Sequence, residues 1–258
     1  MIDCHCHLEQ KVFEEDRDEI VEKCRKELDA VITCCAHPED FELTLRLVKK
    51  YEGFVFASVG IHPEFIKEVS EEEKDDFLEL IRENKQKFVA IGETGLDFFE
   101  VKESEWQEKQ KELFIELISL AKELKKPLIV HARKAYDDSV KILEEEDARR
   151  VLMHMFGAHH LWKRIVENGW MVSVNAIVLR SKKHKKVVRD LPLERLMLET
   201  DSPWLSPVQL TRGIKTRNDP TSVKAVAERV AEIKKVSLEE VDRITTQNAV
   251  RFFDLKIK

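Results

Sequence analysis

Short apolar segments rich in β-branched residues alternate with amphipathic, charged segments along the whole chain. The apolar segments have the length of strands, and the segments between them repeat hydrophobic positions at helical spacing. The expected strands are Ile2–His5, Ala30–Cys34, Phe54–Val59, Phe88–Gly92, Leu128–His131, Val151–His154, Met171–Val174 and Leu196–Glu199. The expected helices are 13–27, 39–51, 71–86, 103–125, 135–147, 158–168, 181–190, 219–235 and 238–253.

This strict alternation predicts an α/β protein with a parallel sheet, and eight units predict a closed TIM (β/α)₈ barrel. The segment 238–253 is then one extra C-terminal helix. An open doubly wound sheet is the alternative, but no Gly-x-Gly-x-x-Gly loop follows an early strand. Because no linker rich in Pro, Gly or Ser interrupts the pattern, we expect residues 1–258 to form a single domain.

The chain is highly charged and acidic. Charged residues make up 36% of it and its formal net charge is −6, whereas about a quarter of residues is typical. An acidic balance argues against binding nucleic acid through bulk electrostatics. A nucleic-acid substrate would have to be held locally, by a metal site and a few basic side chains.

Five cysteines show no metal-finger spacing, and their odd number indicates a reducing compartment. No apolar run approaches the roughly 18 residues of a membrane span, and a strand beginning at Met1 leaves no room for a targeting segment. We therefore expect a cytoplasmic protein that does not enter a membrane, and a monomer by default. Cys4 and Cys6 alternate with histidines and are expected to pack outward, behind the first strand.

Two histidines, His5 and His7, lie at the end of that first strand. Alternate residues of a strand share a face, so the two side chains should point the same way, with Cα atoms roughly 7 Å apart. Both imidazoles could then bind one metal ion. Asp3 shares the face, and we expect it to orient one imidazole.

The other strand ends carry residues of the same kinds. In a (β/α)₈ barrel the chemistry lies at the C-terminal ends of the strands. Ligand-type residues follow six of the eight expected strands: His5 and His7, His62, Glu93 and Asp97, His131, His154, and Glu199 and Asp201. Residues of this kind at one rim predict a metal site.

These motifs resemble a known family. The matching segments are Asp3-x-His5-x-His7-Leu8, Gly60-x-His62-Pro63, Gly92-Glu93-x-Gly95-Leu96-Asp97, Glu199-Thr200-Asp201-x-Pro203, Arg217-Asn218-x-Pro220 and Thr245-Thr246-x-Asn248-Ala249-x-Arg251-Phe252-Phe253. They resemble the signatures of the TatD family of metal-dependent deoxyribonucleases, which are amidohydrolase-like metallohydrolases with a TIM-barrel fold. The resemblance covers the whole chain.

The resemblance implies two divalent metal ions with Glu93 as the bridging ligand. His5, His7 and Asp201 would complete the first site, and His131 and His154 the second. Such mixed imidazole and carboxylate ligands suit Zn, Mn, Co or Ni better than Mg, although the family is usually described as magnesium-dependent. Glu93 and Asp201 are the expected catalytic residues, with Asp201 acting as general base for an attacking hydroxide.

Four further residues are candidate substrate contacts. His62 could contact the substrate or protonate the leaving oxygen. The fork of Arg133 suits a phosphate, with an ion pair to a neighbouring loop as the alternative. Arg217 lies in the long loop after the eighth strand and could line a nucleic-acid channel or be solvated. Trp204 could stack on a base or pack under this loop.

Two segments depart from the family pattern or from simple expectation. After the sixth strand the family commonly shows His-Cys-Phe-Ser-Gly, whereas this chain has His154-Met155-Phe156-Gly157, which lacks the serine. His159 and His160 are expected to be surface residues. The lysines around His184 are expected to form an exposed helix face, with a patch that follows a nucleic-acid backbone as the alternative.

The leading hypothesis is a metal-dependent nuclease that hydrolyses phosphodiester bonds in DNA, acting on single strands or 3′ ends in the 3′-to-5′ direction. One alternative is another hydrolase of the superfamily, acting on an aminoacyl-tRNA, a small ester or a lactone. A second alternative is a non-catalytic nucleic-acid-binding protein with a vestigial site. The motif set argues against the second alternative, because a binding protein has no need of Glu93 and Asp201 together.

Overall fold

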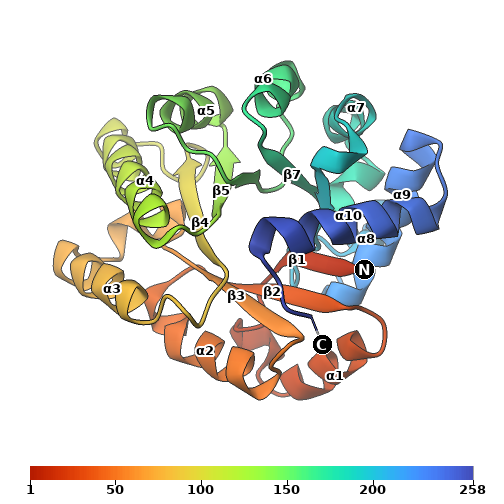
Figure 1. Ribbon diagram of the computed structural model, residues 1–258, viewed down its shortest axis with the longest axis horizontal. Helices are drawn as coiled ribbons and strands as arrows, with labels where there is room; N and C mark the ends of the chain where they lie inside the picture. Colours follow the sequence, from red (N-terminus) through yellow and green to blue (C-terminus); the bar gives the residue numbers. More distant parts are fainter. Residues whose placement is uncertain (258) are drawn as a thin grey trace.

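The computed structural model describes residues 1–257 and shows eight parallel strands in a nearly closed barrel, with helices outside it (Figure 1). Each strand pairs with the next in sequence order. The strands are β1 (Ile2–Cys6), β2 (Ala30–Cys35), β3 (Val55–Val59), β4 (Ala90–Asp97), β5 (Leu128–Arg133), β6 (Val151–Met153), β7 (Met171–Val174) and β8 (Leu196–Leu198). The predicted TIM barrel is confirmed.

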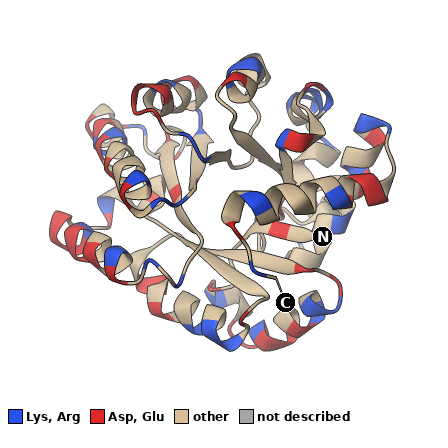
Figure 2. Cartoon of the chain, viewed as in Figure 1, with Lys and Arg blue, Asp and Glu red and all other residues tan. Residues whose placement is uncertain are grey.

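Ten α-helices lie within the described part of the chain. They are α1 (Arg17–Arg25), α2 (Phe41–Lys50), α3 (Glu71–Glu83), α4 (Ser104–Leu124), α5 (Tyr136–Glu145), α6 (Trp162–Glu167), α7 (Lys182–Asp190), α8 (Pro207–Arg212), α9 (Val223–Lys234) and α10 (Leu238–Phe253). The extra helix α10 has the expected bounds, whereas α8 was not expected. Charged residues concentrate on these outer helices (Figure 2). None of the described helices has the length and apolar character needed to cross a bilayer.

The barrel closes between β1 and β8 through backbone groups at its C-terminal rim. The N–H of His7 donates to the carbonyl of Ser202 at 2.8 Å, and the N–H of Asp201 donates to the carbonyl of His5 at 3.0 Å. These two hydrogen bonds fix the segments that carry three of the expected ligands. The contacts that close the barrel therefore also position these ligands.

Asp3 strengthens this closure and does not orient an imidazole, so the role expected for it is wrong. Its buried carboxylate accepts hydrogen bonds from the Thr200 N–H at 3.0 Å, the Thr200 hydroxyl at 2.6 Å and the His5 N–H at 3.2 Å. The register of β1 against β2 shifts between Asp3 and Cys6. This irregularity turns the Asp3 side chain toward the β8 backbone.

The same irregularity overturns the expectation for Cys4. Cys4 packs inside the barrel and Cys6 packs outside it, because the alternation of faces is reset between them. The inner cluster contains residues of every strand: Ile2, Cys4, Ala30, Ile32, Phe56, Ala90, Ile129, Leu152, Met171 and Met197.

Helix α10 and the segment after it close the other end of the barrel. Ala249, Phe253 and Leu255 belong to the same inner cluster as the strand residues. The Asn248 side-chain amide donates to the carbonyls of Leu193 at 3.0 Å and Leu196 at 2.8 Å, which anchors the helix to β8. The C-terminal rim of the strands is thus left as the end where polar side chains gather.

The clamp between Asp3 and Thr200 predicts a specific loss of stability. Thr200→Val keeps the volume but removes the hydrogen bonds to Oδ2 of Asp3 and from the Ser202 N–H, while Oδ1 of Asp3 keeps the Thr200 and His5 N–H groups. Removing one partner of a buried hydrogen bond costs about 1–3 kcal/mol. Urea denaturation of the metal-free protein should show this loss in the free energy of unfolding.

Thr211→Val is the matched control, because the exposed Thr211 hydroxyl bonds only the Pro207 carbonyl. It should change the free energy of unfolding by less than about 0.5 kcal/mol. Equal effects of the two substitutions would contradict a clamping role for Asp3.

Candidate metal centre

The six expected ligands come together at the C-terminal rim. Five of them line a cavity of about 570 Å³, and the sixth, His5, is fully buried beside it. The six residues come from the ends of five strands: His5 and His7 (β1), Glu93 (β4), His131 (β5), His154 (β6) and Asp201 (β8).

One group of ligand atoms surrounds Oε2 of Glu93. This oxygen lies 3.2 Å from Nε2 of His5 and 3.9 Å from Nε2 of His7. The two imidazole nitrogens are 3.1 Å apart. Oδ1 of Asp201 lies 3.7 Å from the His5 nitrogen and 3.6 Å from the His7 nitrogen. Two imidazoles and two carboxylates thus converge on one small volume.

A second group surrounds the other oxygen of the same carboxylate. Oε1 of Glu93 lies 2.8 Å from Nδ1 of His131, 3.5 Å from Nε2 of His62 and 3.6 Å from Nε2 of His154. Glu93 therefore presents one oxygen to each group of histidines. This is the arrangement that a bridging carboxylate requires.

Buried carboxylates fix which nitrogen of two histidines is free to bind a metal. Nδ1 of His7 lies 3.0 Å from Glu9, and Nδ1 of His154 lies 2.9 Å from Glu199. An imidazole that donates its Nδ1–H to a carboxylate directs the lone pair of Nε2 away from it. Both Nε2 atoms therefore face the site and can bind a metal once they carry no proton.

Asp97 orients His131 in a similar way, but it holds Nε2 of the ring and leaves Nδ1 free for a metal. Its carboxylate lies 2.9 Å from Nε2 of His131, which leaves Nδ1 facing Glu93. Sequence reasoning placed Asp97 and Glu199 in motifs without assigning them this role. It missed Glu9 altogether, because Glu9 follows β1 in a turn, where no periodicity predicts the direction of a side chain.

His62 differs from these histidines although it is close to Glu93. Its Nδ1 accepts a hydrogen bond from the backbone N–H of Glu64 at 3.2 Å. A neutral imidazole whose Nδ1 accepts must carry its hydrogen on Nε2. His62 therefore presents a donor to the site, which suits a substrate contact better than a metal ligand.

The buried carboxylates at the centre are held in their charged form. Burial alone would raise the pKa of Glu93, but the nearby His154, His62 and His5 lower it well below its ordinary value. Burial likewise opposes ionisation of Asp201, but the hydrogen bond from His7 and the charge of His154 lower the pKa to about 2. Two ionised carboxylates among oriented imidazole nitrogens form a donor set that fits divalent transition-metal ions.

Two glycines allow the strand ends to approach each other. A Cβ atom at Gly60 would lie 2.8 Å from the carbonyl oxygen of Glu93, and one at Gly95 would lie 2.1 Å from that of His131. Gly95 also has a φ of +134°, which other residues rarely adopt. Both positions need glycine so that β3, β4 and β5 can bring their side chains within ligand distance.

The expected substrate contacts fall into two groups. Trp204 and Arg133 line the cavity. The Trp204 ring is 48% exposed and lies edge-on to His7, with ring centroids 5.0 Å apart, so it is not packed under the loop. The Arg133 guanidinium stacks over Phe99 at 3.9 Å and pairs with Glu100 at 2.8 Å.

Arg217 lies outside the residues that line the cavity. Its guanidinium donates to the carbonyl of Val12 and to the carboxylate of Asp16, and it lies over the ring of Phe13. These contacts tie the loop after β8 to the segment that precedes α1. They give Arg217 a structural role.

The departure from the family pattern after β6 has a structural counterpart. A Cβ atom at Gly157 would lie 2.8 Å from Nε2 of His184, on α7. A serine at this position would require His184 to move. His184 is partly buried behind the rim and does not belong to an exposed helix face. His159 pairs with Asp190 and His160 with Asp137, both nearer the surface.

A (β/α)₈ barrel with this set of ligands at its rim defines the class of metal-dependent hydrolases. A model of the family described as TatD related DNase matches residues 2–254. The chain belongs to the TatD family, and the predicted family and hydrolase class are confirmed.

Relatives match along almost their full length. The chain is 36% identical to human deoxyribonuclease TATDN3 over 98% of this chain and 94% of that protein. It is 35% identical to an uncharacterised metal-dependent hydrolase of Methanocaldococcus jannaschii, over 99% and 98%. The crystal structure of YJJV, a TatD homologue from Escherichia coli, superposes with a TM-score of 0.90 at 26% identity, over 99% and 98%.

The contact between Glu9 and His7 yields a prediction for metal affinity. Glu9→Gln removes the charge that holds the Nδ1–H of His7, and loss of such a partner typically lowers metal affinity by about 10- to 100-fold. Competition of the protein with a chromophoric chelator for Zn²⁺ should show this decrease. Glu14→Gln, at an exposed position, should bind as the wild type does. Wild-type affinity in Glu9→Gln would contradict the orienting role.

The raised pKa values of two histidines predict proton release on metal binding. Burial would lower both values, but Asp97 and Glu93 raise the pKa of His131 to about 9, and Glu199 and Glu93 raise that of His154 to about 10. Both imidazoles are therefore protonated near pH 7 and must lose a proton to bind a metal. Affinity should rise with pH up to about 9–10.

Calorimetry at pH 7 in buffers of different ionisation enthalpy measures this release directly. We expect at least one proton released per chain, with the number falling toward zero above pH 10. Binding at pH 7 without proton release would contradict the protonated state of the metal-free centre.

Proposed function

We propose that this chain hydrolyses phosphodiester bonds of DNA from the 3′ end, with two divalent cations held on either side of Glu93. The proposal rests on one observation: the two oxygens of the Glu93 carboxylate face two different groups of histidines. His5, His7 and Asp201 would hold the first ion with Glu93, and His131 and His154 the second. Zn, Mn, Co or Ni suits these ligands better than Mg.

When bound, such ions supply an activated water and neutralise charge on a phosphate. Asp201 is ionised in the structure and directs Oδ1 toward His5 and His7. Its second oxygen remains available to accept a proton from the attacking water, the role of a general base. His62 presents its Nε2–H toward the same volume, where it can donate to the leaving oxygen.

The lining of the cavity supports action on a strand end. Arg133 is its only Lys or Arg among the described residues, whereas five carboxylates line it. A surface of this kind offers little to a long duplex, whose phosphates need many basic partners. One phosphate beside Arg133 and one base stacked on Trp204 suit a terminal nucleotide.

Hydrolysis of end-labelled single-stranded DNA tests the proposal. The wild type with two ions per chain should shorten a 5′-labelled strand one nucleotide at a time and leave a strand with a blocked 3′ end intact. Asp201→Asn should lose about 10²- to 10⁴-fold in rate, the usual contribution of a general base. Asp138→Asn, at an exposed position on α5, should match the wild type.

Two outcomes would overturn the proposal. One is the absence of cleavage by the wild type in Mg²⁺, Mn²⁺ and Zn²⁺. The other is hydrolysis of an aminoacyl ester or a lactone by a protein that leaves DNA intact, which would favour a different hydrolase on the same site.

A further inference from the structure

Two adjoining hollows lie at the opposite end of the barrel from the metal centre. The larger, of about 1110 Å³, is bounded by α2, by the segments before β4 and β5, and by the segment after α10. The smaller, of about 330 Å³, lies between the end of α4 and the start of β6. Both are lined by Lys125 and Lys126, so the two hollows adjoin at these residues, and together they are called the track.

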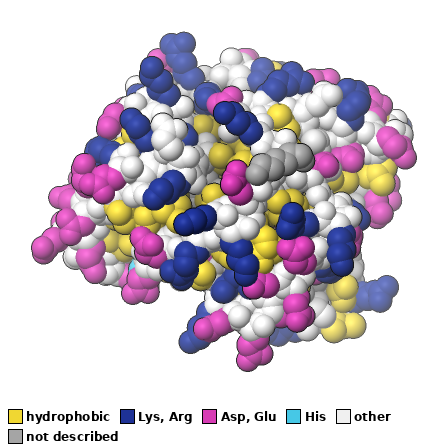
Figure 3. All heavy atoms as spheres, turned by 60° about the horizontal axis from the view of Figure 1, so that its bottom comes forward, with side chains coloured by type: hydrophobic (Ala, Val, Ile, Leu, Met, Phe, Trp, Pro, Cys, Tyr) yellow, Lys and Arg dark blue, Asp and Glu magenta, His cyan; other side chains and the backbone are white. Residues whose placement is uncertain are grey.

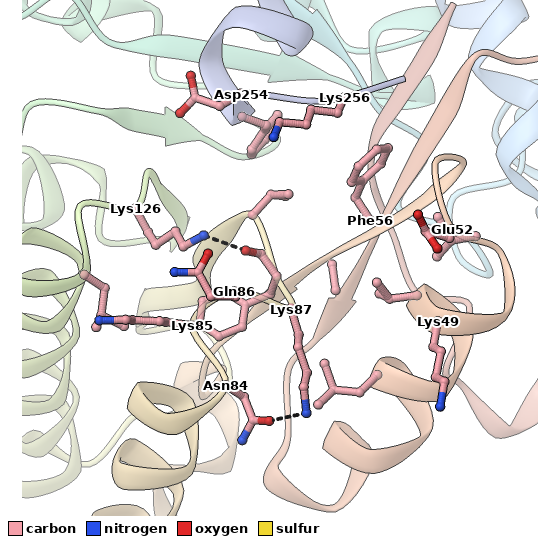
Figure 4. A pocket seen from close by; sticks show the side chains of 18 of the residues that line it. Lys49, Glu52, Phe56, Asn84, Lys85, Gln86, Lys87, Lys126, Asp254 and Lys256 are labelled. Carbon is pink, nitrogen blue, oxygen red and sulfur yellow. Dashed lines mark hydrogen bonds between the residues drawn. The ribbon is translucent and has the colours of Figure 1, made fainter. Parts of the chain in front are cut away.

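This track is basic although the chain as a whole is acidic. Ten Lys and Arg residues line the two hollows against five Asp and Glu residues, in a chain of net charge −6. Figure 3 shows basic side chains around apolar atoms on one face of the molecule, and Figure 4 shows Lys49, Lys85, Lys87, Lys126 and Lys256 around the larger hollow.

The basic side chains of the larger hollow are not neutralised within the described residues. Elsewhere on the surface many Lys and Arg side chains lie within 4.0 Å of a carboxylate; Lys50, for example, pairs with Asp18. None of the seven Lys and Arg residues that line the larger hollow has such a partner in residues 1–257, while Glu123 and Asp254 pair with arginines outside it. Unpaired cations in a concave surface attract an anion.

We propose that this track binds the sugar–phosphate backbone of a single-stranded nucleic acid, an inference that rests on the proposed function. Two adjoining hollows with ten basic residues suit a chain of phosphates better than one phosphate group. The half-buried ring of Phe56 on β3 lines the larger hollow and offers a face for a base. No exposed large hydrophobic residue among those described lines either hollow, which disfavours a membrane surface.

A track at this end would hold a strand while its terminus reaches the acidic cavity at the other end. The second contact would raise the local concentration of strand ends near the metal centre. It would also supply the electrostatic affinity that the cavity, with Arg133 alone, lacks.

The test measures binding of fluorescent (dT)₂₀ by anisotropy in EDTA, so that failure of the nuclease proposal does not affect it. Lys49→Glu, Lys85→Glu and Lys125→Glu together should weaken binding at least tenfold at low salt. The slope of log K against log salt should fall by about two, since each lost contact to a single strand contributes about 0.7.

The control reverses three exposed lysines that line neither hollow and have no ion pair in the described residues: Lys26, Lys163 and Lys235. It has the same net charge as the test variant and should keep at least half of the wild-type affinity. Equal losses in the two variants, or wild-type affinity in the test variant, would overturn the proposal. Equal binding of polyglutamate and (dT)₂₀ would overturn it in favour of an acidic protein partner.

Discussion

The buried carboxylate of Glu93 is the contact on which the rim of the barrel depends. A charge in a protein interior is unfavourable unless partners compensate for it, and here histidines from four strand ends supply the compensation. Because each oxygen faces a different group, the carboxylate fixes the distance between them. A shorter side chain at this position could not face both groups at once.

Compensation in turn requires the imidazoles to be oriented. Glu9, Asp97 and Glu199 each hold the outer nitrogen of one histidine, so the inner nitrogens point at Glu93 and Asp201. The centre therefore contains more carboxylate charge than its inner residues alone would give. This excess raises the pKa of His7, His131 and His154 and gives divalent cations a strong electrostatic advantage once the protons leave.

The sequence sufficed for the fold and for the residues that gather at the rim, because both follow from repeating rules, whereas the division of these residues between two metal ions came from the family resemblance and stays a prediction. Alternation of strands and helices implies a barrel, and chemistry at the strand ends selects His5, His7 and Glu93. Asp3 and Cys4 were placed wrongly because the irregularity in β1 resets the alternation of faces, and a bulge leaves little trace in composition. The roles of Glu9 and Arg217 depend on contacts made in a turn or across 201 residues of sequence, which no local pattern encodes.

The net charge of the chain, unlike its fold, predicts only part of how the molecule meets nucleic acid. A value of −6 argues against binding of nucleic acid over the whole surface, but the net charge does not say where the charges lie. The fold separates the charges along the barrel axis, with carboxylates around the metal centre and, at the far end, lysines that have no carboxylate partner within residues 1–257. The acidic cavity at the metal centre repels a phosphate chain until metal ions bind there, whereas the basic track attracts a phosphate chain without metal ions. Capture of a strand and hydrolysis at its terminus can therefore depend on different ends of one small domain.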